Sequence, residues 1–228
     1  MKLLVVTPMR EELNGFLQTC IRHGYAAKTA AIGRLPVARI PDLGITLARG
    51  GTGKAQFAVQ TQHLLDKGGD WDLVVCAGAA GALAADLSVG DVVVATATIE
   101  HDYDNRFSTR PLPRFEGAPA AIDSLRRVPL ASHSFKAHFG PIVSGDEDIV
   151  DPERRRALHQ STGALVVAWE GAGGARACAF SGVPFVEIRG VTDVADQKAP
   201  SDFEANLGVA MGNVAALILS WIDSRSRS

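Results

Sequence analysis

Six short runs of apolar residues recur along the chain, and apolar and polar residues mostly do not alternate within them. A strand with one face in water alternates, whereas a strand that is covered on both faces is apolar throughout. The runs therefore predict an α/β protein with a central sheet flanked by helices. They cover residues 2–6, 73–77, 92–95, 142–143, 164–167 and 184–188.

Helical patterns lie between most of these runs. Asp151 is a typical helix cap, and Gly68 followed by Gly69 is a typical helix end. The proline-rich segment 102–129 is expected to be a long loop, and residues 223–228 a solvated tail. No linker or repeat divides the sequence, which predicts a single domain over residues 1–228. The expected helices cover residues 9–23, 54–67, 152–160, 171–180 and 202–220.

Charge and composition argue against several classes of protein. The 23 basic and 25 acidic side chains give a net charge of −2, which disfavours binding to nucleic acid. We find no apolar run of the about 18 to 20 residues that a membrane helix needs, and the apolar start of the chain is too short for a signal peptide. Three scattered cysteines predict reduced, packed thiols in a cytoplasmic protein.

Acidic residues follow three of the expected strands, and ligands of open α/β sheets bind beyond the carboxyl ends of strands. Glu12 could act there as a general base, or simply favour a helix N-terminus together with Glu11. Glu170 lies in an apolar setting and needs hydrogen-bond partners, either ribose hydroxyls or protein groups. Asp193 could be a general acid if burial raised its pKa, or a cap, and Arg189 could orient a carboxylate.

The glycine-rich segments are less specific. The segment 50–54 lacks the spacing of a nucleotide-binding phosphate loop, so a tight turn before a helix is favoured. Small residues in segment 76–83 would let a flat ligand lie on the backbone, or allow close packing of a turn. The histidines lack metal-ligand spacing, although His101 lies beside Asp102 and Asp104, and we expect no metal. The glycines of a nucleophile elbow are missing around Ser144.

Taken in order, these motifs resemble the nucleoside phosphorylase/hydrolase superfamily, and within it most closely the 5′-methylthioadenosine/S-adenosylhomocysteine nucleosidases. The resemblance runs from about residue 2 to residue 218. It implies one domain with a mixed sheet flanked by helices, usually a homodimer, that hydrolyses the N-ribosidic bond of a purine nucleoside without metal or cofactor. The matching segments are 5–12, 51–54, 78–81, 89–94, 144–146, 169–172 and 189–196.

The same resemblance assigns roles to residues. Glu12 matches the glutamate that activates water, Glu170 the glutamate that binds ribose, and Asp193 the aspartate that protonates the purine. Phe107 and Phe115 lie in the segment that reaches the neighbouring subunit's 5′ pocket in relatives, and Arg189 is expected to orient a carboxylate. The remaining expected substrate-binding residues are Thr52, Ala79, Ala80, Gly81, Asp148, Ile149, Val167, Ala168, Trp169 and Thr192.

Three positions depart from the nucleosidase pattern and bear on substrate choice. Trp169 stands where methionine is usual, Ala79 where serine is usual, and Asp148 where an aromatic residue stacks on adenine. Trp169 could take over packing against the nucleoside. These departures leave the base and the 5′ substituent open, including a futalosine-type substrate.

Two further alternatives remain. Superfamily phosphorylases usually carry a Gly-Asp-Pro-x-Arg loop near the N-terminus, whereas this chain has Glu11 and Glu12 there, which favours water over phosphate. Arg10 and Arg49 keep phosphorolysis as the alternative reaction. A nucleoside-binding protein without catalysis is the alternative of another class, and the joint presence of Glu12, Glu170 and Asp193 argues against it.

Overall fold

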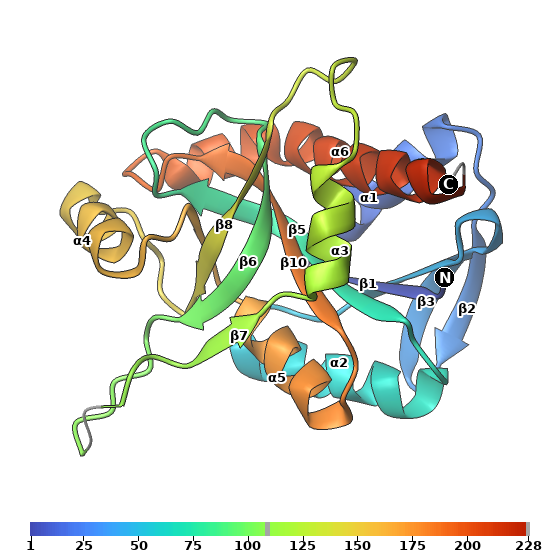
Figure 1. Ribbon diagram of the computed structural model, residues 1–228, viewed down its shortest axis with the longest axis horizontal. Coiled ribbons are helices and arrows are strands. Elements are labelled where there is room, and N and C mark those ends of the chain that lie inside the picture. The colour runs from blue at the N-terminus through green and yellow to red at the C-terminus, as the bar shows by residue number, and fades with distance from the viewer. Residues whose placement is uncertain (108–109, 227–228) are drawn as a thin grey trace.

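A computed structural model describes residues 1–107 and 110–226 of the chain, and in this part ten strands form one sheet (Figure 1). Its longest path runs β10-β6-β8-β9-β5-β1-β4-β3-β2, and β7 pairs with β6. The strands are β1 (Leu3–Thr7), β2 (Lys28–Ile32), β3 (Leu35–Ile40), β4 (Ile45–Arg49), β5 (Leu73–Ala82), β6 (Val92–Glu100), β7 (Arg114–Glu116), β8 (Ala137–Ser144), β9 (Val166–Ala168) and β10 (Phe185–Asp193).

Strand β5 is the hub of this sheet. It pairs in parallel with β1 and β10 and antiparallel with β9. Strand β8 pairs in parallel with β6 and with β9, and β10 pairs antiparallel with β6. Strands β5, β9, β8, β6 and β10 therefore form a closed ring. Strands β4, β3 and β2 extend the sheet beyond β1. The predicted mixed sheet of an α/β fold is confirmed.

Helices cover both faces of the sheet. In Figure 1, α1 and α6 lie on one side, and α2 and α5 lie on the other. The helices are α1 (Arg10–Arg22), α2 (Lys54–Gly68), α3 (Pro119–Arg126), α4 (Pro152–Thr162), α5 (Gly171–Ser181) and α6 (Ala199–Ser226), with a short 3-10 helix η1 (Pro41–Leu43).

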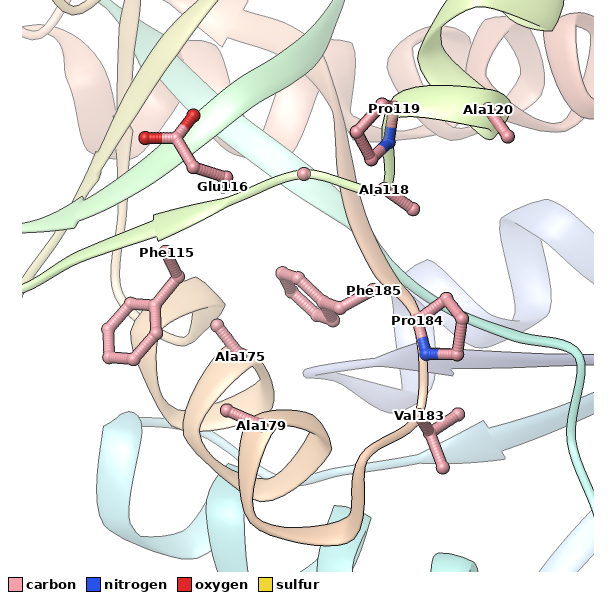
Figure 2. A pocket seen from close by; sticks show the side chains of 11 residues that line it. Phe115, Glu116, Ala118, Pro119, Ala120, Ala175, Ala179, Val183, Pro184 and Phe185 are labelled. Atoms are coloured by element: carbon pink, nitrogen blue, oxygen red, sulfur yellow. The ribbon is translucent and has the colours of Figure 1, made fainter.

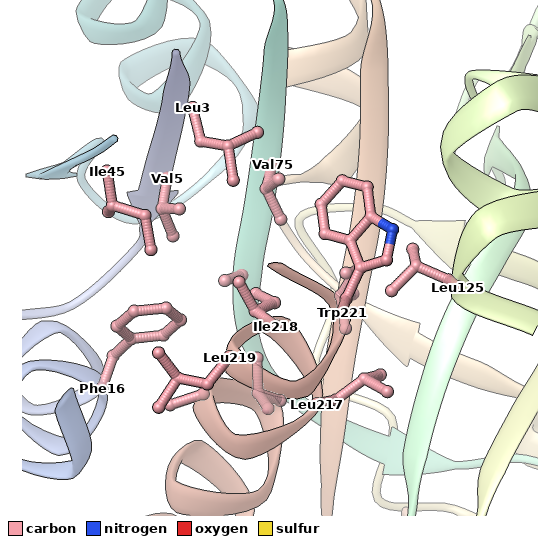
Figure 3. Packing of buried hydrophobic residues seen from close by; sticks show 14 of the residues in the cluster. Leu3, Val5, Phe16, Ile45, Val75, Leu125, Leu217, Ile218, Leu219 and Trp221 are labelled. Atoms are coloured by element: carbon pink, nitrogen blue, oxygen red, sulfur yellow. The ribbon is translucent and has the colours of Figure 1, made fainter. Parts of the chain in front are cut away.

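Strand β1 demonstrates why its apolar residues do not alternate with polar ones. Leu3 and Val5 point into a cluster with Phe16 of α1 and Trp221 of α6 (Figure 3), whereas Leu4 and Val6 join α2 and α5 on the other face. Because successive side chains of a strand point to opposite faces, burial on both sides requires an apolar residue at every position.

Helix α6 corrects the expectation about apolar length. It is the one helix in the described part of the chain that is long and apolar enough to cross a membrane, because an 18-residue window within Ala199–Arg225 has a mean hydropathy of 1.6. Scattered polar residues such as Asn213 lie between the apolar residues of α6, so its high mean hydropathy is not visible as a continuous apolar run in the sequence. In the fold, 44% of the window is buried, and this face contributes Met211, Val214 and Ile218 to the core.

Other departures from the sequence predictions concern local structure. The expected loop 102–129 contains β7 and α3, and the expected tail is helical to Ser226, residues 227–228 lying outside the described part. Strand β5 continues through the small residues of segment 78–82, for which either a ligand-binding backbone or a packed turn was expected, and β10 continues to Asp193. Strands β2, β3 and β4 were not expected. Neighbouring strands supply the hydrogen bonds that stabilise these short segments. All three cysteines are free and buried, as predicted.

Candidate functional site

The carboxyl ends of β1, β5 and β10 lie side by side because these strands are parallel. Val6 of β1 is in register with Cys76 of β5, and Arg189 of β10 is in register with Gly78 of β5. Side chains that follow or end these strands therefore meet at one edge of the sheet. Glu12, in the first turn of α1 after β1, is brought to this edge.

The carboxylate of Glu12 is buried and held by two backbone donors. The N–H of Ala79 donates to Oε1 at 2.8 Å, and the N–H of Met9 donates to Oε2 at 2.7 Å. Burial raises the pKa of Glu12 to about 7, although the Arg189 guanidinium and these hydrogen bonds act in the opposite direction. A carboxyl group that titrates near neutral pH is suited to accept a proton from a reacting molecule.

Arg189 is buried at the centre of the cluster, and each guanidinium nitrogen has a partner. Nε donates to Glu187 at 2.8 Å and Nη1 to the Ala79 carbonyl at 3.2 Å. Nη2 lies 3.3 Å from Glu170 Oε2 and 3.5 Å from Cys76 Sγ. Burial alone would lower the pKa of Arg189, but the surrounding acidic groups raise it above its usual value. Arg189 therefore contacts two carboxylates, those of Glu187 and Glu170.

Glu170 is the residue before α5, and a second loop reaches it. Its Oε1 accepts a hydrogen bond from the N–H of Gly53 at 3.2 Å, while Oε2 faces Arg189. Gly53 has a φ of +80°, which a residue with a side chain adopts only with strain, and this conformation ends the turn before α2. Burial raises the pKa of Glu170, and Arg189 opposes this effect.

Gly78 explains how closely these groups approach the backbone of β5. A methyl group on Gly78 would collide with Nη1 of Arg189 and would lie 2.9 Å from Oε1 of Glu12. Only hydrogen fits at this position without displacing one of the two charged groups. The small residues of this segment therefore let charged side chains of the protein pack on the backbone of β5. The sequence had suggested that a flat ligand lies there, or that the segment forms a turn.

Asp193, the last residue of β10, lies further along the same edge. It pairs with Gly81, which is three residues beyond Gly78 on β5 and so about 10 Å away along the strand. Its Oδ2 accepts from the Thr192 hydroxyl at 2.8 Å, and its Oδ1 accepts from the N–H of Ala195 at 2.9 Å. Burial raises the pKa of Asp193 although both hydrogen bonds act against the rise.

The remaining expected residues differ in position. Val167 pairs with Gly81, and both Val167 and Ile149 belong to an apolar cluster that also contains Ala195, next to Asp193. Asp148 is exposed. Ala79 and Ala80 are buried in β5, and Ala168 is buried in β9. Trp169 is half-buried, and Thr52 is exposed in the turn before α2.

The two expected phenylalanines do not join the carboxylates in this chain. Phe107 is fully exposed. Phe115 lies on β7 under the guanidinium of Arg176 and borders a cavity of about 450 Å³ (Figure 2). Phe185 lines the same cavity and begins β10, whereas Asp193 ends that strand, about 26 Å away. This apolar cavity is therefore separate from the carboxylate edge.

Several residues of the site were not expected from the sequence. Glu187 is buried in β10, where it accepts from Arg189 and, at 2.6 Å, from the hydroxyl of Thr98. The missed signal was a glutamate within an apolar strand, because a buried charge requires a partner. A second missed group joins Lys54 to Glu100 and Asp102, beside Glu170. Within the described residues, no group of three or more His, Cys, Asp or Glu side chains is arranged to hold a metal ion.

Comparison with known proteins decides the family. The model of the phosphorylase superfamily matches residues 2–223. The chain belongs to this family. Among curated proteins, the 5′-methylthioadenosine/S-adenosylhomocysteine nucleosidase of Tolumonas auensis is 31% identical over 186 residues, which are 78% of this chain and 80% of that protein. The resemblance inferred from the motifs is confirmed.

Solved structures of this family share the fold across nearly the whole chain. The 5′-methylthioadenosine/S-adenosylhomocysteine nucleosidase of Neisseria meningitidis, in complex with methylthio-immucillin-A, has a TM-score of 0.84 and 29% identity, and covers 98% of this chain and 99% of that one. The futalosine hydrolase of Helicobacter pylori has a TM-score of 0.84 and 26% identity, covering 98% of both chains. The overall fold therefore does not distinguish a 5′-methylthioadenosine/S-adenosylhomocysteine nucleosidase from a futalosine hydrolase.

Proposed function

We propose that the protein is an N-glycosyl hydrolase that releases the base from a purine nucleoside of the 5′-methylthioadenosine/S-adenosylhomocysteine type. The observation that carries the proposal is that the Glu12 and Glu170 carboxylates both lie close to the Arg189 guanidinium, with Asp193 further along the same edge. Three acidic groups from distant parts of the sequence thus have raised pKa values at one edge of the sheet.

The chemistry assigns a separate task to each group. When the bond between C1′ and N9 breaks, the electron pair leaves with the purine, and protonated Asp193 gives its proton to N7. Ionised Glu12 accepts a proton from water, whose oxygen bonds to C1′. Glu170 accepts hydrogen bonds from the ribose hydroxyls and stabilises positive charge on the sugar. The products are free base and free sugar, and solvent returns the proton from Glu12 to Asp193.

The charge balance of the site supports water as the nucleophile. Glu12, Glu170 and Glu187 surround one guanidinium, that of Arg189, which already donates from all its nitrogen atoms. A phosphate ion would meet excess negative charge at this position. Arg10 and Arg49, which kept phosphorolysis as an alternative, both have exposed side chains.

Futalosine-type hydrolysis is the second candidate. It is favoured by the equal fit of the chain to a futalosine hydrolase structure. The exposed carboxylate of Asp148 and the half-buried indole of Trp169 stand at positions that differ from the nucleosidase pattern, so they are the first residues to vary when the substrate is sought.

The experiment is incubation of the purified protein with 5′-methylthioadenosine, S-adenosylhomocysteine, futalosine and adenosine, followed by chromatography for the free base. We expect base release from a thionucleoside without added phosphate, together with free sugar. Strict dependence on phosphate, with a sugar 1-phosphate as product, would identify a phosphorylase. Binding of a nucleoside without base release would support the non-catalytic alternative.

The homodimer implied by the family resemblance and the cytoplasmic location suggested by the three cysteines complete the proposal. Phe107, exposed in one chain, is then expected to lie against a second copy. Light scattering with size-exclusion chromatography measures the mass of the particle, and a mass of one chain would contradict the dimer.

A further inference from the structure

A cluster of charged side chains that the proposed mechanism does not use lies next to Glu170. Lys54, the first residue of α2, donates from Nζ to Oε1 of Glu100 at 3.0 Å and to Oδ1 of Asp102. Arg176 of α5 donates to the other oxygen of Glu100, from Nε at 3.2 Å. The cluster therefore ties the start of α2 to the end of β6 and to α5.

The backbone of Lys54 takes part in the same cluster. Its N–H donates to Oδ1 of Asp146 at 2.9 Å, and the N–H of Asp146 donates to Oδ2 of Asp102 at 2.9 Å. Lys54, Asp102 and Asp146 thus form a closed ring of hydrogen bonds that joins three segments distant in sequence. On the other side, a side chain on Gly173 of α5 would collide with the Lys54 carbonyl.

This ring fixes the residue that contacts Glu170. Gly53 immediately precedes Lys54 and donates its N–H to Oε1 of Glu170. Gly51 and Gly53 both have positive φ. Because glycine can adopt many other backbone conformations, contacts with neighbouring residues must hold the turn before α2 in this one. Removal of the Lys54 ammonium would leave Glu100 and Asp102 without the cation they share.

We propose that Lys54 is a positioning residue, whose ion pairs with Glu100 and Asp102 hold the Gly53 N–H on Glu170 and so orient that carboxylate toward the ribose hydroxyls. This inference rests on the proposed function. Lys54 touches neither the sugar nor the base in this scheme, and it acts through Gly53. The carboxylate partners raise the pKa of Lys54 against the effect of burial, so the ammonium stays charged at neutral pH.

The variant Lys54→Met removes the charge and keeps most of the length of the side chain. Lys54→Arg is the conservative variant, and Lys67→Met is the matched control, because Lys67 lies exposed at the other end of the same helix. The values of kcat/KM are measured for 5′-methylthioadenosine and for its 2′,3′-dideoxy analogue, which gives Glu170 no hydroxyl to bind.

We expect Lys54→Met to lower kcat/KM for the ribonucleoside about fivefold to tenfold, as for one lost hydrogen bond, and for the dideoxy analogue less than about twofold. Lys54→Arg should recover most of the loss, and Lys67→Met should behave as the wild type. Equal losses on the two nucleosides would indicate a merely structural role and would overturn the inference, as would no loss on either.

A second measurement does not depend on activity. Exchange of the Gly53 amide hydrogen with solvent, followed by NMR without substrate, should become at least about tenfold faster in Lys54→Met, while amides of β5 keep their protection. Unchanged exchange at Gly53 would overturn the inference. If the wild type releases no base, the proposed function fails, and this exchange measurement alone decides whether Lys54 holds the contact. Asp102→Asn replaces Lys54→Met if the latter does not fold.

Discussion

Arg189 and Glu187 form an ion pair, with 2.8 Å between Nε and Oε1, in which the side chains are 1% and 0% exposed. They are two residues apart on β10, and side chains at this spacing point to the same face of a strand. The pair places a fixed positive charge beneath Glu12 and Glu170. The candidate site is therefore built around the buried guanidinium of Arg189.

Loss of this cation should be costly. Arg189→Met leaves Glu187 and Glu170 buried without a positive partner, and we expect the free energy of unfolding to fall by about 3 to 5 kcal/mol. Urea denaturation measures the change. The control is Arg106→Met, whose ion pair with Asp104 is exposed and should contribute less than about 1 kcal/mol. Equal effects of the two variants would contradict the central role of Arg189.

Glu12 and Glu11 form a matched pair for testing the water activator. Glu12→Gln keeps the size and removes the base, so base release should fall by about 10²-fold to 10⁴-fold while nucleoside binding persists. Glu11 is exposed, and Glu11→Gln should retain activity. Steady-state kinetics and calorimetric binding distinguish the two effects. Turnover at the wild-type rate in Glu12→Gln would refute the assignment.

The pH dependence of stability should report the same carboxyl group. Burial raises the pKa of Glu12 from 4.5 to about 7, so between these values the folded chain holds a proton that the unfolded chain has lost. The resulting stabilisation is complete below about pH 4.5 and is lost as the pH rises through about 7, by about 3 kcal/mol in total.

We therefore expect the melting temperature of the wild type, relative to that of Glu12→Gln, to decrease between pH 5 and pH 8. Calorimetry across this range makes the measurement, and subtraction of the variant removes the contributions of the other groups. Catalysis should change in the opposite direction, since Glu12 must be ionised to accept a proton. A melting difference that is constant with pH would show that Glu12 has an ordinary pKa.

Asp193 can be tested through the leaving group. Asp193→Asn cannot donate a proton to N7, and purine release should fall by about 10²-fold or more. A 4-nitrophenyl riboside has a leaving group that needs no proton, so the same variant should lose much less activity on that substrate. Asp86→Asn, at an exposed position, is the control. Equal losses on the two substrates would argue against a general acid.

Two glycines should respond in opposite ways to the same substitution. Gly78→Ala places a methyl group against Arg189 and Glu12, so we expect a large loss of activity and of stability. Gly208→Ala lies on an exposed turn of α6 with open space around it, and should stabilise the chain by about 0.5 to 1 kcal/mol. Thermal unfolding and base release of both variants provide the comparison.

Much of the fold could be predicted from local patterns. The apolar runs marked β1, β5 and β10 because burial on both faces excludes polar residues from these strands. Asp151 was expected to cap a helix, and its side chain accepts from the N–H of Glu153 at the start of α4. Strand β7 and helix α3 were missed because prolines near them suggested a loop, whereas pairing with β6 stabilises the strand.

The candidate site was predictable only in part. Glu12, Glu170, Asp193 and Arg189 were singled out because they follow or end expected strands, and the family resemblance suggested a role for each. Glu187 was missed within an apolar run, and Lys54 was interpreted as part of a turn. Their partners, Thr98 and Glu100, are 89 and 46 residues away in the sequence. No local pattern indicates such pairings.

The sequence by itself determined the α/β class, the buried strands and the acidic residues at their ends, since these depend on burial and on short-range periodicity. Only the tertiary structure decided that Arg189 bonds Glu170 and Glu187, that Gly53 reaches Glu170, and that the cavity at Phe115 lies elsewhere. These contacts join segments whose proximity depends on strand order and register. Hydrogen bonds and ion pairs act over a few ångströms, so their partners become definite only after the sheet has brought the segments together.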